Sequence, residues 1–453
     1  MHNLKRTFLL LVAVTTVAVN CRAFSLMGPF ASWQSAALGY TGTGGPMALG
    51  EEYRLTVPVL TYGFDGTFLN FFGASGVTAV NSAFGILNAV PAASAMPANL
   101  TGAGFPSRSL APPNPTATNL RILDLRSAVL ATMMGQMGLA SPERWVWTLR
   151  DRAVVGTATN YTVIQRNYDP VTWQPTDRVN DALYNYTISD TGATASTSPF
   201  VRTGDANSRS VASVEATGLP VGQYFTSLTR DDLGGLRYLL RFNNVNTETL
   251  QANAILANIS SPYAPVQGTN LVNTNTPIAT ARRPGINKIS FSSVGVDALL
   301  NVTIQPVTNR YTDTFYHPTN GYLTNQVLER ITTIPDIIFT AADLTGTALN
   351  NGATFTGATS ARWTSFATLN SAVASTAFGP GVIPAGTSNA TAIVITFNSL
   401  GPSRLNVRTA GNQFLDQFSP STNSVWGYFD TVIHSVFPDG TTIQALERQL
   451  YGP

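Results

Sequence analysis

Hydrophobic side chains recur every three or four residues in three segments of the N-terminal half, a spacing that predicts amphipathic helices. These segments are 76–90, 124–137 and a stretch that begins at 229. Asp124 is placed to cap the second helix, and Gly138 follows its last turn. Thr229 opens the third helix, and Asp232 stands three residues later as its capping partner. The sequence therefore supplies both the apolar faces and the ends of these helices.

Short runs of apolar and β-branched residues predict strands elsewhere in the chain. One strand is expected over 53–63, followed by a turn at Asp65-Gly66, and residues 151–225 carry short alternating stretches rich in Thr, Asn and Tyr. Beyond residue 286, short apolar runs are separated by turns, and these runs cover 289–294, 299–304, 337–340, 392–397 and 426–430. Such spacing favours a sandwich-like, β-rich region, closed by a turn at 438–440 and a short final helix.

The elements together predict an α+β fold class with two domains, which a chain of 453 residues is long enough to form. The expected divisions are a signal peptide over 1–23, an α+β domain over 24–250 with a β-rich insertion at 151–225, an Asn-, Thr- and Pro-rich linker over 251–286, and a β-rich C-terminal domain over 287–453.

The N-terminus has the pattern of a secretory signal. Lys5 and Arg6 precede an apolar run over 8–19, and the segment ends at Ala23. The run is short for a bilayer span, so no transmembrane segment is expected after cleavage. An uncleaved anchor and lipidation of Cys21 stay open as alternatives. We therefore expect a secreted or cell-surface protein.

Charge is scarce, because only 11% of the residues are Asp, Glu, Lys or Arg, against roughly 25% in most soluble proteins. The 26 basic residues include Lys5, Arg6 and Arg22, so cleavage after Ala23 leaves 23 basic against 24 acidic residues. Such a chain offers no basic surface for nucleic acid. Cys21 leaves with the signal, so no disulfide is expected. A net charge near zero permits self-association, which is one expected mode of action.

Two segments carry a family resemblance. Residues 124–141 have the sequence Asp-Leu-Arg-Ser-Ala-Val-Leu-Ala-Thr-Met-Met-Gly-Gln-Met-Gly-Leu-Ala-Ser, and residues 228–239 have the sequence Leu-Thr-Arg-Asp-Asp-Leu-Gly-Gly-Leu-Arg-Tyr-Leu. The first resembles the active-site helix of the matrixin branch of the metzincin metalloproteases in the residues that lead into the helix, in its apolar face and in its terminal glycine. The second is similar to the Leu-Ser-x-Asp-Asp motif that opens the last helix of that family. The resemblance implies a metzincin-like fold for residues 24–250.

The zinc site of that family needs two histidines one helical turn apart, a third histidine and a glutamate that activates water. At the matching positions this chain has Ala131 and Gly135 for the first two histidines, Thr132 for the glutamate and Ser141 for the third histidine. The methionine turn of the family is missing as well, because Met137 is the last methionine. We therefore expect no zinc, no other cofactor and no protease activity.

Other chemistry has weaker support. Asp231 and Asp232 are adjacent carboxylates, but at a helix start they are expected to serve the cap and the helix dipole. A carboxylate pair for glycoside hydrolysis has no short motif and stays open. Acidic residues that could ligate calcium, although outside any regular loop spacing, are Asp65, Asp124, Asp313, Asp336 and Asp343. Tryptophans that could form a carbohydrate platform, although such residues are more often core, are Trp145, Trp147, Trp173, Trp363 and Trp426.

We expect a secreted, non-catalytic cell-surface, matrix or appendage component that binds a surface partner or assembles with itself. The alternatives are a secreted hydrolase with a glycosidase-like carboxylate pair and an adhesion module that binds calcium or carbohydrate. Two acids converging in a tryptophan-lined cleft would favour the enzyme, whereas exposed β edges or a broad apolar patch would favour assembly.

Overall fold

The computed structural model describes most of the chain after residue 22. The described ranges are 23–28, 31–40, 45–52, 54–100, 104–106, 111–203, 209–213, 220–250, 254–257, 276–297, 300, 302–341, 393–397, 404–407, 415–417 and 424–452. The expected signal peptide up to residue 22, Cys21, Trp363 and Asp343 lie outside the described residues.

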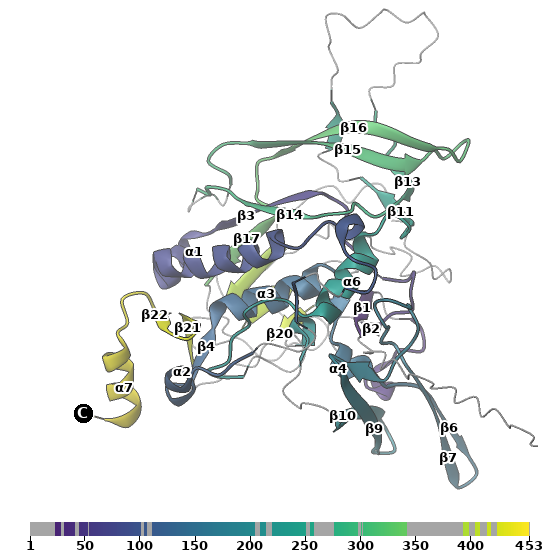
Figure 1. Ribbon diagram of the computed structural model, residues 1–453, viewed down its shortest axis with the longest axis horizontal. Helices are drawn as coiled ribbons and strands as arrows, with labels where there is room; N and C mark the ends of the chain where they lie inside the picture. Colours follow the sequence, from purple (N-terminus) through teal and green to yellow (C-terminus); the bar gives the residue numbers. More distant parts are fainter. Residues whose placement is uncertain are drawn as a thin grey trace, which may run out of the picture.

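A six-stranded sheet occupies the centre of the molecule (Figure 1). Its strands, in spatial order, are β14 (Ser290–Ser293), β3 (Val59–Phe64), β17 (Ile337–Thr340), β18 (Ile393–Phe397), β19 (Arg404–Val407) and β20 (Leu415–Gln417). β3 pairs in parallel with both β14 and β17, and β17 pairs in parallel with β18, while β19 is antiparallel to both of its neighbours, β18 and β20. Nearly every residue of β3 is buried, as expected for a central strand of a parallel array.

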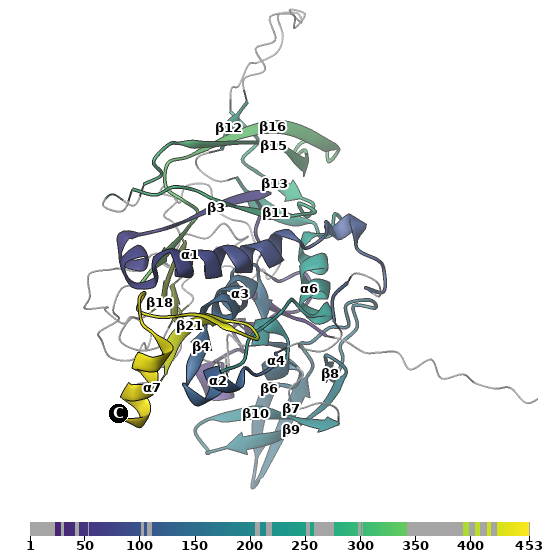
Figure 2. The same cartoon turned by 60° about the vertical axis from the view of Figure 1, so that its left-hand side comes forward.

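Three helices lie on one side of this sheet: α1 (Gly66–Asn88), which contacts it directly, α3 (Leu125–Gln136) and α6 (Arg230–Leu240). α1 lies between the sheet and α3 (Figure 2). Phe68 and Phe84 of α1 lie 6.2 and 5.9 Å from the ring of Phe339 in β17, so aromatic side chains fill the space between helix and sheet. Every residue of α3 is buried, which places this helix at the core of the molecule.

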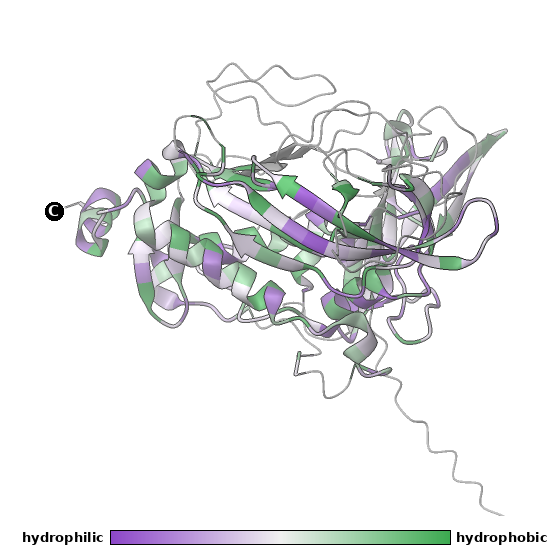
Figure 3. Ribbon diagram, turned by 90° about the horizontal axis from the view of Figure 1, so that it is seen from above, coloured by the Kyte–Doolittle hydropathy of each residue, from purple (hydrophilic) through white to green (hydrophobic). Residues whose placement is uncertain are grey.

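A second sheet of five antiparallel strands lies above the first in Figure 1. Its order is β11 (Asn246–Thr249), β13 (Thr280–Arg283), β15 (Val307–Tyr316), β16 (Leu323–Thr332) and β12 (Ala254–Leu256). Half-buried and exposed positions alternate along much of β15, and Figure 3 shows hydrophobic and hydrophilic residues interspersed along the strands of this face. One side of this sheet is therefore turned toward solvent.

Residues 148–203 form two hairpin units at the opposite end of the molecule. β6 (Thr148–Val155) and β7 (Ala158–Ile164) make a two-stranded ribbon, and β8 (Arg178–Val179), β9 (Ala182–Asp190) and β10 (Ala195–Thr203) make a three-stranded sheet. The remaining elements are β1 (Ser25–Gly28), β2 (Gly45–Pro46), β4 (Ile122–Asp124), β5 (Leu139–Ala140), β21 (Val425–Phe429), β22 (Ile433–Val436), α2 (Pro115–Asn119), α4 (Pro142–Trp145), α7 (Ile443–Tyr451) and three short 3-10 turns, η1 (Ala36–Leu38), η2 (Ala93–Ala95) and η3 (Val211–Ser213).

The expected α+β, β-rich fold class is confirmed, and so are the helices α3 and α6 with their predicted caps. The first helix begins ten residues before its predicted start at 76, because Asp65 accepts a hydrogen bond from the Phe68 amide and caps a helix where a turn was expected. Residues 302–304 lie outside the named strands, so the strand predicted over 299–304 is wrong in that part. Ile304 is 70% exposed, so the apolar character of this run does not reflect burial in a sheet.

The two predicted domains do not have separate sheets. β3, from before the predicted linker, lies between β14 and β17, which follow it, and β4 pairs in parallel with β21. Two strands, β12 and β13, lie within the predicted linker over 251–286. The division at 251–286 is therefore corrected to one in which both halves of the chain build the central sheet.

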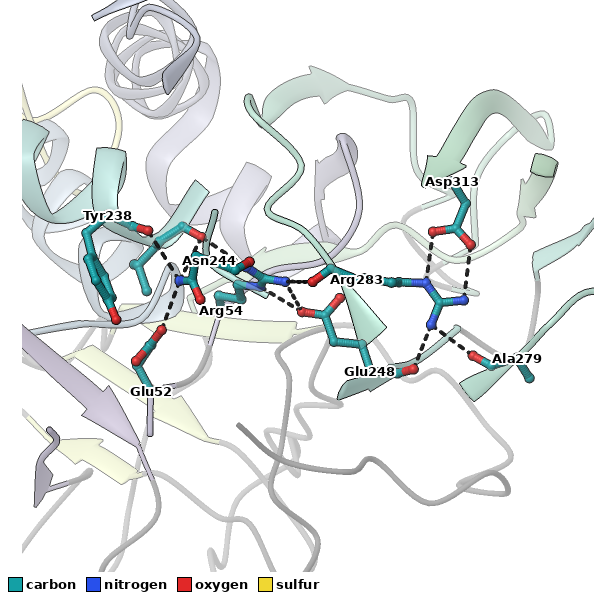
Figure 4. A network of polar contacts seen from close by, with 9 residues as sticks. Glu52, Arg54, Tyr238, Asn244, Glu248, Ala279, Arg283 and Asp313 are labelled. Carbon is teal, nitrogen blue, oxygen red and sulfur yellow. Dashed lines mark hydrogen bonds and ion pairs between the residues drawn. The ribbon is translucent and has the colours of Figure 1, made fainter. Parts of the chain in front are cut away.

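Two buried ionic contacts hold the second sheet against the rest of the molecule. Arg330 of β16 donates to both carboxylate oxygens of Asp336 at 2.7 and 2.6 Å, and Asp336 accepts the Thr61 amide of β3 at 2.8 Å. In the second contact, Arg54 donates to Glu248 of β11 at 2.6 Å and to the carbonyl of Arg283 at 2.9 Å (Figure 4). These pairs tie β11, β13 and β16 to segments near the N-terminus.

We expect Asp336→Asn to lower the free energy of unfolding by about 3–5 kcal/mol, because it leaves the buried Arg330 guanidinium without a countercharge. Replacing both partners, Arg330→Met with Asp336→Leu, should recover most of this loss, since no charge then stays buried. Chemical denaturation measures both effects. Asp190→Asn, which breaks the partly exposed pair with Arg152, is the control and should lower stability far less. A single Asp336 variant as stable as the unaltered chain would contradict the assignment.

Candidate functional site

The four positions that match the metzincin zinc site have packing and capping roles. Ala131, Thr132 and Gly135 are buried within α3, and the Thr132 hydroxyl donates to the Ala128 carbonyl at 2.8 Å. Ser141 is the N-cap of α4, where its hydroxyl accepts the Arg144 amide at 3.4 Å. Across the described ranges, no group of three or more His, Cys, Asp or Glu side chains is placed to hold a metal ion.

The predicted capping role of Asp232 is confirmed. The Thr229 hydroxyl accepts the Asp232 amide at 3.3 Å, and the Asp232 carboxylate accepts the Thr229 amide at 2.9 Å, which completes a capping box. Its neighbour Asp231 accepts the Asn180 amide at 2.7 Å, beyond its own helix. Asp231 and Asp232 therefore both act as acceptors for backbone amides in the first turn of α6.

A further carboxylate, Glu143 of α4, joins these two acids around η3. The amide of Ser210 donates to Glu143 at 3.0 Å, while the amides of Val211 and Ala212 donate to Asp232 at 3.0 and 3.1 Å. Three consecutive backbone amides are thus received by two carboxylates from different helices. The contact fixes residues 210–212 between α4 and α6.

Asp231 and Asp232 border a small recess, but it is too narrow to admit a water molecule. Its walls are formed by Ala23, Phe24, Ser25, Leu139, Ala140, Pro142, Ser210, Ala212, Asp231 and Asp232. Hydrolysis by a carboxylate pair requires room for both a substrate and a water. This recess therefore offers no site for such a reaction.

Burial sets the electrostatics of the cluster. The pKa of Glu143 is raised to about 8, mainly by desolvation and to a smaller extent by the nearby charge of Asp232. Desolvation also raises the pKa of Asp232, although its hydrogen bonds to Thr229 and η3 act in the opposite direction. At pH 7 the protonated form of Glu143 predominates, and it still accepts the Ser210 amide.

The other acids considered as calcium ligands are separated and have structural partners. Asp65 and Asp124 cap α1 and α3, Asp313 pairs with Arg283, and Asp336 pairs with Arg330. Each carboxylate accepts hydrogen bonds from its own element or from a buried arginine. The structure thus does not bring these four residues together into one site.

The candidate tryptophans are also dispersed. Trp145 and Trp426 are buried in the core, whereas Trp147 and Trp173 are partly exposed. Trp147 packs on Tyr186 of β9, while Trp173 contacts Tyr238 of α6. The four described tryptophans therefore do not form one platform, and the burial of Trp145 and Trp426 agrees with the expectation that such residues are more often core.

One polar pair was missed by the sequence reasoning. His434 of β22 lies 3.0 Å from the Asp430 carboxylate across the turn after β21. The Val432 amide and then His434 lower the pKa of Asp430. The four-residue spacing across a tight hairpin is a signal that could have indicated the pair.

Comparison with protein-family models, with curated proteins and with solved structures found no match to this chain. Within the part of the chain that the structure describes, no helix combines the length and the apolar character needed to cross a membrane. Functional inference therefore rests on the geometry of the chain's own residues.

We expect Glu143→Gln to flatten the pH dependence of stability. The pKa of Glu143 is about 8 when folded and about 4.5 when unfolded, so between these values the folded chain binds more protons. Stability contributed by the protonated form is complete below about pH 4.5 and is lost as the pH rises toward about 8. Glutamine cannot titrate, so the variant should lack this decline.

Denaturant titrations at several pH values between about 4 and 9 measure the effect. Glu447→Gln, at an exposed position of α7, serves as the matched control and should keep the slope of the unaltered chain. Identical slopes for the Glu143 variant and the unaltered chain would show that Glu143 does not retain its proton.

Proposed function

We propose that the chain is a secreted, non-catalytic component of a cell surface, matrix or appendage, and that it assembles with copies of itself by strand addition. The observation that carries this proposal is the ribbon of β6 and β7, which extends away from the body of the molecule (Figures 1 and 2). A projecting ribbon with an open edge is a template for pairing with another chain.

The ribbon is tied to the neighbouring hairpin only part of the way along its length. Arg152 of β6 donates to Asp190 of β9 at 2.6 Å, and the Tyr161 hydroxyl of β7 donates to the same carboxylate at 2.7 Å. Beyond this point, Val154 and Val155 are 58% and 64% exposed. The end of the ribbon is thus apolar and exposed, while the contacts of Arg152 and Tyr161 with Asp190 fix the middle of the ribbon in position.

The outer edge of β7 lacks the features that usually protect an edge strand. Among the described strands, β7 pairs only with β6. Its seven residues, Ala-Thr-Asn-Tyr-Thr-Val-Ile, include no charge, no proline and no glycine. In contrast, β6 carries Arg150, Asp151 and Arg152. The edge open to pairing is therefore that of β7.

A second copy of the chain suits this edge. Antiparallel pairing of β7 with its twofold-related copy would use the same surface on both chains and form a four-stranded sheet. No like charges would face each other across the new pairing, because β7 is uncharged. The low charge of the whole chain also limits repulsion between copies.

A metzincin-like origin of residues 24–250 belongs to the same proposal. It is supported by the two capped helices at the motif positions, α3 and α6. The buried Ala131 and Gly135 are compatible with a fold that is kept as a packing unit after its metal ligands are lost.

We expect Asn160→Lys, at an exposed position of β7, to shift self-association to at least roughly tenfold higher concentration. The twofold pairing would bring two lysines close together, and each like-charge contact opposes assembly. Light scattering and sedimentation velocity over a range of concentrations measure the change. Asn325→Lys, at an exposed position of β16, is the matched control and should leave assembly unaltered.

A chain that stays monomeric at every concentration would refute the assembly proposal. Assembly that is equally unaffected by both lysine substitutions would place the interface away from β7.

A further inference from the structure

Arg241, which follows the last turn of α6, has an unusual environment. Its guanidinium lies 4.5 Å from the ring centroid of Trp173 and 4.6 Å from that of Tyr238. No carboxylate pairs with it among the described residues, and its Nε is buried without an acceptor. By contrast, the buried Arg283 and Arg330 each bind a carboxylate through two nitrogens. Arg241 is thus a positioned cation for which the described part of the chain supplies no countercharge.

The position of Trp173 depends on a strained turn. Its φ is +61°, in the left-handed region that bulky residues rarely adopt. The turn is held by Asp169, whose carboxylate accepts the Val171 and Thr172 amides at 2.9 and 2.6 Å and whose carbonyl accepts the Trp173 amide at 2.9 Å. Strain of this kind persists where the surroundings enforce it, and it is concentrated at functional sites.

The turn is also fixed directly to α6. Arg237 donates to the carbonyl of Pro170, and it binds the carbonyls of Pro97 and Ala98 at 2.6 and 2.8 Å. Gly234 allows the close approach, because a β-carbon at this position would collide with Pro170. Burial and then the charge of Arg241 lower the pKa of Arg237, which reflects the positive potential at this end of the helix.

We propose that Arg241, Trp173 and Tyr238 form a binding site for the carboxylate of a uronic acid unit in an acidic polysaccharide. The guanidinium fork matches a carboxylate through two parallel hydrogen bonds. The two rings hold the guanidinium in place before binding, so little side-chain freedom is lost when the ligand arrives. This site is independent of the β7 edge and gives the chain a ligand in addition to its own copies.

The partly exposed Trp173 favours a sugar over an acidic peptide. In a uronic acid the carboxylate is attached directly to the ring, so pairing with Arg241 places the sugar ring beside the indole. Aromatic side chains with an apolar body and a polar rim suit such a ligand. A glutamate side chain would pair with the arginine but place no ring beside the exposed part of the indole.

Titration calorimetry of the full chain with trigalacturonate at low salt tests the site. We expect binding that Arg241→Gln weakens at least tenfold and that Arg241→Lys weakens severalfold, because lysine keeps the charge but loses the fork. Arg282→Gln is the matched control: Arg282 is an exposed arginine 5.5 Å from the ring of Tyr316 and is not held between two rings. It should leave the affinity unchanged.

Three results would overturn the proposal. These are no binding of trigalacturonate to the unaltered chain, equal binding by the Arg241 and Arg282 variants, and equal binding of the neutral trisaccharide maltotriose. Binding of hexaglutamate as tightly as trigalacturonate would overturn the assignment to a saccharide. Thermal unfolding verifies that the variants fold. If Arg241→Gln does not fold, Arg241→Lys still tests the site.

Discussion

The parallel pairing of β3 with β14 and β17 is the constraint on which the rest of the structure depends. A strand that ends at Phe64 must be inserted between strands that begin at Ser290 and Ile337, so the sheet cannot close until most of the chain is present. Asp336 strengthens this junction, because its carboxylate accepts the Thr61 amide of β3 while pairing with Arg330 of the second sheet. One buried carboxylate therefore positions two sheets relative to each other, and α1 packs on the central sheet with α3 on its other side.

Much of the local structure could be predicted from the sequence, because a helix cap forms between residues that are close together in the sequence. Asp124 and Thr229 identify the starts of α3 and α6 through their own side chains. The partners of β3 could not be predicted, since alternation indicates which face of a strand is buried but not which strand lies beside it. The early start of α1 was hidden by consecutive aromatic residues around Phe71 and by the kink at Gly73, which interrupt the helical period.

The candidate site shows the same division between local and long-range information. The capping roles of Asp231 and Asp232 follow from their place at a helix start. The contribution of Glu143 does not, because it depends on a turn about 67 residues away that delivers the Ser210 amide. The environment of Arg241 depends likewise on the left-handed Trp173, and a tryptophan in that conformation gives no sequence signal.

The four positions compared with a metzincin zinc site and the exposed features follow from the same cost of burying a polar group without a partner. Inside α3, complete burial leaves space for Ala131 and Gly135 but would penalise an unpaired polar side chain, so these positions serve packing. The acids that remain buried are retained where backbone amides or arginines satisfy them, as at Asp232 and Asp336. An unpartnered polar group costs less at the surface, where water substitutes for a partner, than in the interior. The open edge of β7 and the partly exposed Arg241, which has no carboxylate partner among the described residues, are therefore better places to seek a function than the packed interior.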